Sequence, residues 1–159
     1  MREILFKAKR EDNGEWVEGY YVKAEKLDNC GVEHYIIEQS ANGSQYLIKE
    51  ETLCRYAELP DKNGNKIWEH DILIANNDKN QLMQVKFGEF GVVNIETEEV
   101  VDDVIGWYYQ PLETDLISKL EPFCLPMTLT NFYIDRCEFK VYGNIFDNPE
   151  LLRGNKDDK

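Results

Sequence analysis

Residues 61–74 read Asp61-Lys62-Asn63-Gly64-Asn65-Lys66-Ile67-Trp68-Glu69-His70-Asp71-Ile72-Leu73-Ile74, a tight-turn signal that runs directly into an amphipathic strand. Asp and Asn at turn positions hydrogen-bond their own backbone, and glycine supplies the positive φ that such turns require. A similar turn, Asp12-Asn13-Gly14, precedes Trp16, and a third Asn-Gly pair lies at residues 42–43 between apolar runs. The sequence therefore predicts a hairpin-rich, mainly β scaffold.

Strand signals recur along the whole chain. We expect strands where β-branched and aromatic residues lie between turn signals. The expected strands cover residues 3–9, 15–25, 32–38, 45–50, 53–57, 82–87, 91–96, 103–109 and 137–145, with a short turn at Gly88-Glu89-Phe90-Gly91. The Asn13-Gly14 pair permits positive φ at both central positions, which matches strand twist, so residues 3–25 are predicted to form a hairpin.

Helix signals are few. Residues 111–120 carry four apolar residues at helical spacing behind Pro111, which suits a first helical turn. A last turn is expected at residues 148–152, where Asn148 would cap and Pro149 would occupy the first helical position.

The length of 159 residues is enough for one substantial core without disulfides or metals. We expect one domain over residues 1–152, with an irregular insertion at 110–136 and a frayed tail at 153–159. The predicted fold is mainly β with a small-barrel-like, SH3-like core and one or two short helices; the alternative is α+β. Trp16, Trp68 and Trp107 are expected to be largely buried.

The composition is acidic, with 31 Asp and Glu against 18 Lys and Arg and a net charge of −13. Binding to nucleic acid or to anionic membranes depends on cations, so this charge opposes both. The longest uncharged stretch, residues 122–134, is too short and too interrupted by polar residues and prolines to span a bilayer. We expect neither nucleic acid nor membrane as a partner.

The sequence has few residues that could bind a metal through sulfur or imidazole. They are four cysteines and two histidines: Cys30, Cys54, Cys124, Cys137, His34 and His70. No Cys-x-x-Cys spacing occurs and the histidines stand in no ligand register with the cysteines, so we expect no structural metal. No apolar leader follows Met1, which favours free thiols in a reducing cytoplasm. The glycines at residues 88–91 match neither the dinucleotide-binding nor the P-loop pattern, and we expect no cofactor.

Glu69, His70 and Asp71 form the one acid–base cluster in the sequence. A histidine beside carboxylates can act as a general base or a metal ligand. Adjacent residues on a strand point to opposite faces, however, so the three side chains need a bend to converge. We interpret them as an exposed polar edge beside a buried Trp68 and Ile72, and we expect no catalytic residue.

An acidic region lies between Phe87 and Ser118, where there are eight acids and no Lys or Arg. It lacks the Asp-x-Asp-x-Asp-Gly order of a calcium loop. Eight carboxylates cannot be buried together without cations, so we expect a negative surface that faces solvent and governs partner binding. The candidate partner-binding residues are Glu89, Glu96, Glu98, Glu99, Asp102 and Asp103, and Glu113 and Asp115 complete the region.

Three blocks of the sequence together resemble the YopX family of phage and prophage proteins. They are Met1-Arg2-Glu3-Ile4-Leu5-Phe6-Lys7-Ala8, the central residues Asp61 to Ile72 quoted above, and Val141-Tyr142-Gly143-Asn144-Ile145-Phe146-Asp147-Asn148-Pro149-Glu150-Leu151-Leu152. Two departures stand out: the family usually has Gly where His70 stands, and Thr-Gly where this chain has Glu58-Leu59.

The resemblance implies a mainly β fold with a barrel-like core, a bacteriophage or prophage setting and residence in the bacterial cytoplasm, and it carries over no catalytic residues. We interpret the motif positions as structural: Asn13, Gly14, Asp61, Asn63, Gly64, Trp68, Asp71, Gly143, Asn144, Asn148 and Pro149.

The leading functional hypothesis is a non-enzymatic accessory protein that acts through protein contacts, expected as a homo-oligomer whose exposed sheet edges pair or are covered by neighbours. One alternative is an acidic decoy that imitates nucleic acid and occupies a host protein. Another is direct nucleic-acid binding by a small barrel and its aromatics, which the net charge opposes. A hydrolase that uses Glu69, His70 and Asp71 ranks last.

Overall fold

The computed structural model describes residues 2–94, 96–112, 120 and 125–153. Its strands form two antiparallel sheets, which confirms the prediction of a mainly β fold, but neither sheet closes into a barrel. The chain divides into two compact units, Met1–Glu58 and Leu59–Lys159. We expected one domain over residues 1–152. The sequence has no linker-like composition at the boundary between the units, because the boundary falls inside strand β5 (Cys54–Pro60). Glu58, the last residue of unit 1, has a left-handed φ of 60°.

Unit 1 is built on two hairpins and a short return. Its elements are β1 (Phe6–Lys9), β2 (Trp16–Glu25), β3 (Val32–Ile37), β4 (Gln45–Leu47), the 3-10 helix η1 (Glu50–Thr52) and the first part of β5. The strand order is β4-β3-β2-β1-β5, and β6 of unit 2 follows β5. The Asn13-Gly14 turn joins β1 to β2 with Gly14 at φ 73°.

The unit 1 core lies inside this curled sheet. Ala8, Val17, Ile36 and Ile48 are its buried centre. The end of β4 returns to β1, where the Lys49 amide donates to the Lys9 carbonyl at 2.9 Å and the Glu11 amide to the Leu47 carbonyl at 2.9 Å. The sheet does not close along its whole length because β1 and β4 have four and three residues, against ten in β2.

Unit 2 contains the second sheet, in the order β10-β9-β8-β7-β11. Its described elements are β6 (Lys66–Trp68), β7 (Asp71–Ala75), β8 (Asp78–Val93), β9 (Val100–Pro111), β10 (Met127–Thr128), helix α1 (Asn131–Arg136), β11 (Lys140–Asn144) and the 3-10 helix η3 (Pro149–Arg153). Every residue of β7 is buried, since β8 and β11 flank it and side chains cover both faces. Tyr109 packs edge-on against Phe139, with ring centroids 4.9 Å apart.

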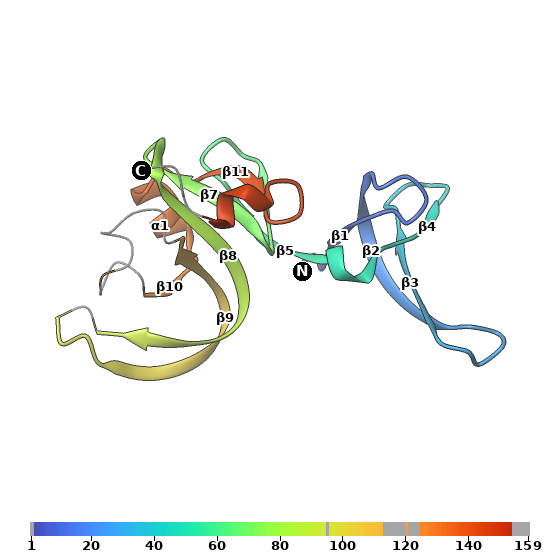
Figure 1. Ribbon diagram of the computed structural model, residues 1–159, viewed down its shortest axis with the longest axis horizontal. Coiled ribbons are helices and arrows are strands. Elements are labelled where there is room, and N and C mark those ends of the chain that lie inside the picture. The colour runs from blue at the N-terminus through green and yellow to red at the C-terminus, as the bar shows by residue number, and fades with distance from the viewer. Residues whose placement is uncertain (1, 95, 113–119, 121–124, 154–159) are drawn as a thin grey trace. The chain divides into compact units, whose positions relative to one another are not determined.

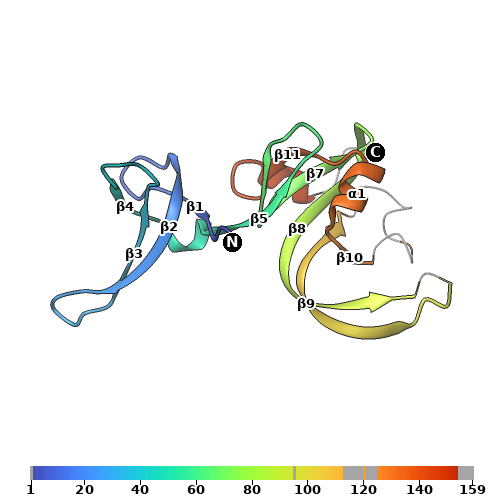
Figure 2. The same ribbon diagram turned by 180° about the vertical axis from the view of Figure 1, so that it is seen from behind.

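β8 and β9 form a long, curved hairpin (Figures 1 and 2). The turn expected at residues 88–91 is wrong: both glycines lie inside β8, and Gly88 stands directly opposite Gly106. Glycine in a strand interior often marks a tight bend or a close approach of another backbone. Phe90 stacks on Tyr108, with centroids 4.7 Å apart, and these two rings flank the glycine pair.

Three other expectations need correction or fall outside the described residues. Helix α1 lies where an irregular insertion was expected, with the Thr130 hydroxyl capping it by accepting from the Tyr133 amide. The helix expected at 111–120 falls mostly on residues outside the description, and Pro111 ends β9. Trp68 is buried as expected, whereas Trp16 and Trp107 are only half-buried because each lies on a sheet face that is partly open to solvent.

Candidate protein-interaction surface

The central turn is organised by one buried carboxylate. Asp61 Oδ1 accepts from the amides of Asn63 and Asn65 at 2.8 Å each, and Oδ2 accepts from the Asn65 side chain at 3.2 Å and from the Val141 amide at 2.9 Å. Burial alone would raise the pKa of Asp61, but these hydrogen bonds outweigh it and hold the pKa below its usual range. Gly64 closes the turn at φ 83°. All acceptor capacity of Asp61 therefore serves the fold.

The Glu69-His70-Asp71 cluster does not converge on one point. His70 has a left-handed φ of 69° and divides the amphipathic strand expected after the 61–64 turn into β6 and β7. Asp71 is 1% exposed, which corrects the expected exposed polar edge, and its Oδ2 accepts from the Trp68 amide at 2.8 Å. His70 Nε2 lies 3.9 Å from Glu69 Oε1. The bend exists, yet it turns Asp71 into the protein interior.

The closing block is a close approach between a glycine and a capping side chain. A Cβ on Gly143 would lie 2.4 Å from Asn148 Oδ1. That oxygen accepts from the Asn144 amide at 3.3 Å, and the Asn144 side chain accepts from the amides of Phe146 and Asp147. η3 then begins at Pro149. These residues shape the backbone of unit 2.

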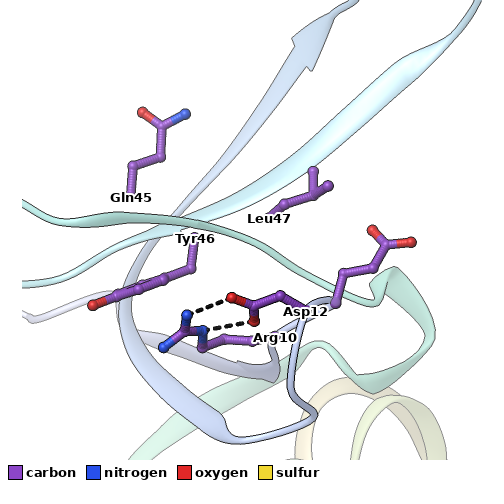
Figure 3. Close-up of a pocket in the computed structure, with 6 residues that line it drawn as sticks. Arg10, Asp12, Gln45, Tyr46 and Leu47 are labelled. Carbon is purple, nitrogen blue, oxygen red and sulfur yellow. Dashed lines mark hydrogen bonds and ion pairs between the residues drawn. The ribbon is translucent and has the colours of Figure 1, made fainter.

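A pocket on unit 1 is lined by the β1–β2 turn and by β4 (Figure 3). Arg10 dominates it. The Arg10 guanidinium makes two hydrogen bonds to the Asp12 carboxylate and lies over the Tyr46 ring, 4.2 Å from its centroid. The hydrogen bond to Arg10 lowers the pKa of Asp12. The guanidinium of Arg10 is therefore already paired with a carboxylate and an aromatic ring. Its contact with Tyr46 holds β4 against the β1–β2 turn.

A polar network in unit 1 escaped sequence reasoning. The Tyr21 hydroxyl lies 2.7 Å from His34 Nδ1, and His34 Nε2 lies 3.2 Å from Glu50 Oε2. Tyr21 and His34 sit diagonally across the β2–β3 pairing, and Glu50 starts η1. Burial and the Glu50 charge raise the pKa of Tyr21, which favours its neutral hydroxyl.

The acidic region is exposed, as expected. In the described chain its six candidate residues, Glu89, Glu96, Glu98, Glu99, Asp102 and Asp103, all face solvent. They lie on the part of the β8–β9 hairpin between residues 86 and 107, which we call the acidic arm, and Lys86 is its one base. Glu113 and Asp115 lie outside the described residues. The partner-binding role of these carboxylates stays a prediction.

Apolar side chains share the arm with the acids. Ile105 is 76% exposed, Val101 62% and Val100 61%. Glu89 pairs across the hairpin with Ile105, and Phe87 with Trp107, whose rings meet edge to face at 5.0 Å. Contiguous exposed apolar residues with a polar rim mark protein-interaction sites.

No cluster of three or more His, Cys, Asp or Glu side chains suited to a metal ion occurs within the described residues. Cys30 and Cys137 are free thiols, and the Cys54 thiol donates to the Thr52 carbonyl at 3.2 Å. The expected absence of a structural metal stays a prediction. Of the helices that the structure describes, none has the length and apolar character needed to cross a membrane.

A family model described as YopX protein matches residues 5–153, which reaches into both units and contains the central and closing sequence blocks and the end of the first block, Leu5 to Ala8. The chain belongs to the YopX family. Among solved structures, the crystal structure of protein EF1440 from Enterococcus faecalis is similar to this YopX-family chain at 19% identity, with a TM-score of 0.46, covering 96% of this chain and 99% of that one. A comparison with curated proteins finds no match.

Proposed function

We propose that this YopX-family chain is a non-enzymatic accessory protein of a bacteriophage or prophage that acts in the bacterial cytoplasm by binding another protein through the acidic arm. One observation carries the proposal: six exposed carboxylates share this hairpin with exposed Ile105, Val100 and Val101. Charge of one sign speeds encounter with an oppositely charged partner, and apolar contact holds the complex together.

The polar clusters elsewhere support a structural role. Asp61 and Asp71 cap turns, and Arg10 is paired within its pocket. The Tyr21–His34–Glu50 network places a histidine between a hydroxyl and a carboxylate, but the raised pKa of Tyr21 favours the neutral hydroxyl. We therefore assign no catalytic residue. That the chain forms a homo-oligomer is a separate proposal, which the molecular mass from sedimentation analysis would test.

Affinity capture from a host lysate tests the proposal. The baits are the wild type and a variant with Glu96→Gln, Glu98→Gln, Glu99→Gln, Asp102→Asn and Asp103→Asn. A matched control changes five exposed acids outside the arm to glutamine, and these are Glu11, Glu25, Glu51, Glu138 and Glu150.

The proposal predicts a protein captured by the wild type and the control variant but lost with the arm variant. Equal capture by all three baits contradicts it. A captured nucleic-acid-binding protein that DNA displaces would favour the acidic decoy.

A further inference from the structure

The acidic arm has an open backbone edge along β9. The Trp107 carbonyl accepts a 3.0 Å hydrogen bond from the Leu129 amide, so the backbone groups of Trp107 point away from β8. Successive residues of a strand alternate in direction, and the groups of Ile105 and Asp103 therefore point outward as well. β10 pairs with β9 at Tyr108 and Tyr109. Among the described residues, no strand pairs with this edge at residues 101–105.

An open edge of this kind is a template for one more strand. A two-stranded ribbon by itself is only marginally stable in water, and a third strand adds hydrogen bonds and covers apolar surface. Ile105, the most exposed apolar side chain of β9, belongs to this edge, and Val101 lies at the register shift between Asp102 and Val100. The edge of β8 gives a partner strand less apolar side chain to cover, because Gly88 and Gly91 have no side chain and Glu89 between them is charged.

The charge of the edge decides what kind of strand fits. Asp102 and Asp103 lie side by side on β9 and are both exposed. Pairing with a second copy of the arm would bring further carboxylates against them, and like charges on paired strands are destabilising. A cationic strand gains attraction at the same positions. The occupant favoured by the edge is therefore a basic segment of a different protein.

We propose that the acidic arm binds an extended basic segment of its partner as an added antiparallel strand along residues 101–105 of β9. This inference rests on the proposed function and specifies the chemistry of the partner. Side chains directly opposite on paired strands meet on one face. The segment then carries two successive cations opposite Asp103 and Asp102, with apolar β-formers opposite Ile105, Val104 and Val101.

A synthetic peptide, acetyl-Thr-Val-Val-Lys-Lys-Val-Thr-amide, is the probe for this strand. Amide exchange of the full-length protein, followed by NMR with the peptide in excess, is the first measurement. We expect exchange at Ile105 to slow by about tenfold or more, because this amide becomes hydrogen-bonded. The Asp103 amide already donates to Asp102 Oδ1 at 2.9 Å, so its exchange should change less. The amide of Val104, which points toward β8, should change much less.

Two matched peptides separate strand addition from simple charge attraction. N-methylation of the first Val and the first Lys removes two amides that face β9, whereas N-methylation of the second Val and the second Lys removes two amides that face away. The two peptides have the same composition and charge. We expect the first modification to abolish binding and the second to leave it within about threefold, since only amides that bond across the ladder contribute.

Exchanging the charges of the protein and the peptide tests whether the two lysines of the peptide lie opposite Asp102 and Asp103. The protein variant with Asp102→Lys and Asp103→Lys changes exposed side chains only. We expect it to lose the lysine peptide and to bind the same peptide with glutamates in place of both lysines.

Protection at Ile105, together with the predicted N-methyl selectivity, supports strand addition. Equal binding of the two N-methylated peptides overturns it, as does saturable binding without amide protection, and both results leave the proposed protein-binding function standing. Absence of saturable binding also overturns the inference. The proposed function fails separately, when lysate capture is indifferent to the arm variant.

Discussion

Asp61 Oδ2 accepts a hydrogen bond of 2.9 Å from the Val141 amide, which lies 80 residues further along the chain. This bond ties the central block of the sequence to the closing one. Residues of both blocks therefore have a structural role in unit 2. They carry the family resemblance, and they also connect distant parts of the unit 2 backbone.

The first prediction concerns that carboxylate. Asp61→Ala leaves the amides of Asn63, Asn65 and Val141 without their acceptor, and a buried unsatisfied donor costs about 1–3 kcal/mol. We expect a loss of roughly 3 kcal/mol in unfolding free energy by urea denaturation. Asp28→Ala is the control, since Asp28 accepts one amide bond in an exposed turn. A loss at Asp61 no larger than at Asp28 contradicts the assignment.

The second prediction is a pH dependence. Folding lowers the pKa of Asp61, so its ionised form stabilises the folded state above the ordinary aspartate pKa of about 3.9. This contribution disappears as the pH falls through the lower folded-state pKa. The difference in unfolding free energy between wild type and Asp61→Asn should therefore shrink below about pH 4. A difference that stays constant down to about pH 3 would show that the charge of Asp61 contributes nothing.

The third prediction tests the close approach at Gly143. Gly143→Ala places a methyl group against Asn148, and overpacking of this kind costs typically about 1–3 kcal/mol. Gly106→Ala is the matched control, because a Cβ at Gly106 meets no atom within 4 Å. Adding Asn148→Ala to Gly143→Ala should cost less than the sum of the single changes. Additive losses would mean that the two side chains do not meet.

The fourth prediction addresses the Tyr21–His34–Glu50 network. Tyr21→Phe removes the hydroxyl that pairs with His34 Nδ1, and we expect a loss of about 1 kcal/mol in unfolding free energy. Tyr20→Phe removes a hydroxyl from an exposed side chain that pairs with Gln39, and it should cost only a few tenths of a kcal/mol, or about the experimental error. Equal effects of the two substitutions would argue against a structural role for the network.

The sequence was most informative where one short motif determines its own geometry. Asn13-Gly14 and Asn63-Gly64 signal turns because their residue types satisfy the local backbone, and both turns are present. His70 misled the prediction: a non-glycine residue at positive φ is uncommon, so a strand was expected to continue through it. A glycine, which the resemblance to the family implies at this position, would adopt that conformation without a steric cost.

Longer-range features were not accessible from local patterns. Gly88 looked like a turn, and only its pairing with Gly106 across the hairpin reveals a bend inside one strand. Tyr21, His34 and Glu50 come together through strand register and η1, which no spacing rule reports. The exposure of the acidic arm was predictable because repulsion among unpaired carboxylates excludes burial.

The most direct test of the central claim is the salt dependence of association between this protein and its captured partner. We predict that the wild type and the five-acid control variant associate fast at low salt and lose rate steeply as salt rises. The variant with Glu96, Glu98, Glu99, Asp102 and Asp103 changed to amides should associate more slowly, with a flattened salt dependence. Unchanged association kinetics for that variant at low and high salt would contradict the claim that the acidic arm is the binding surface.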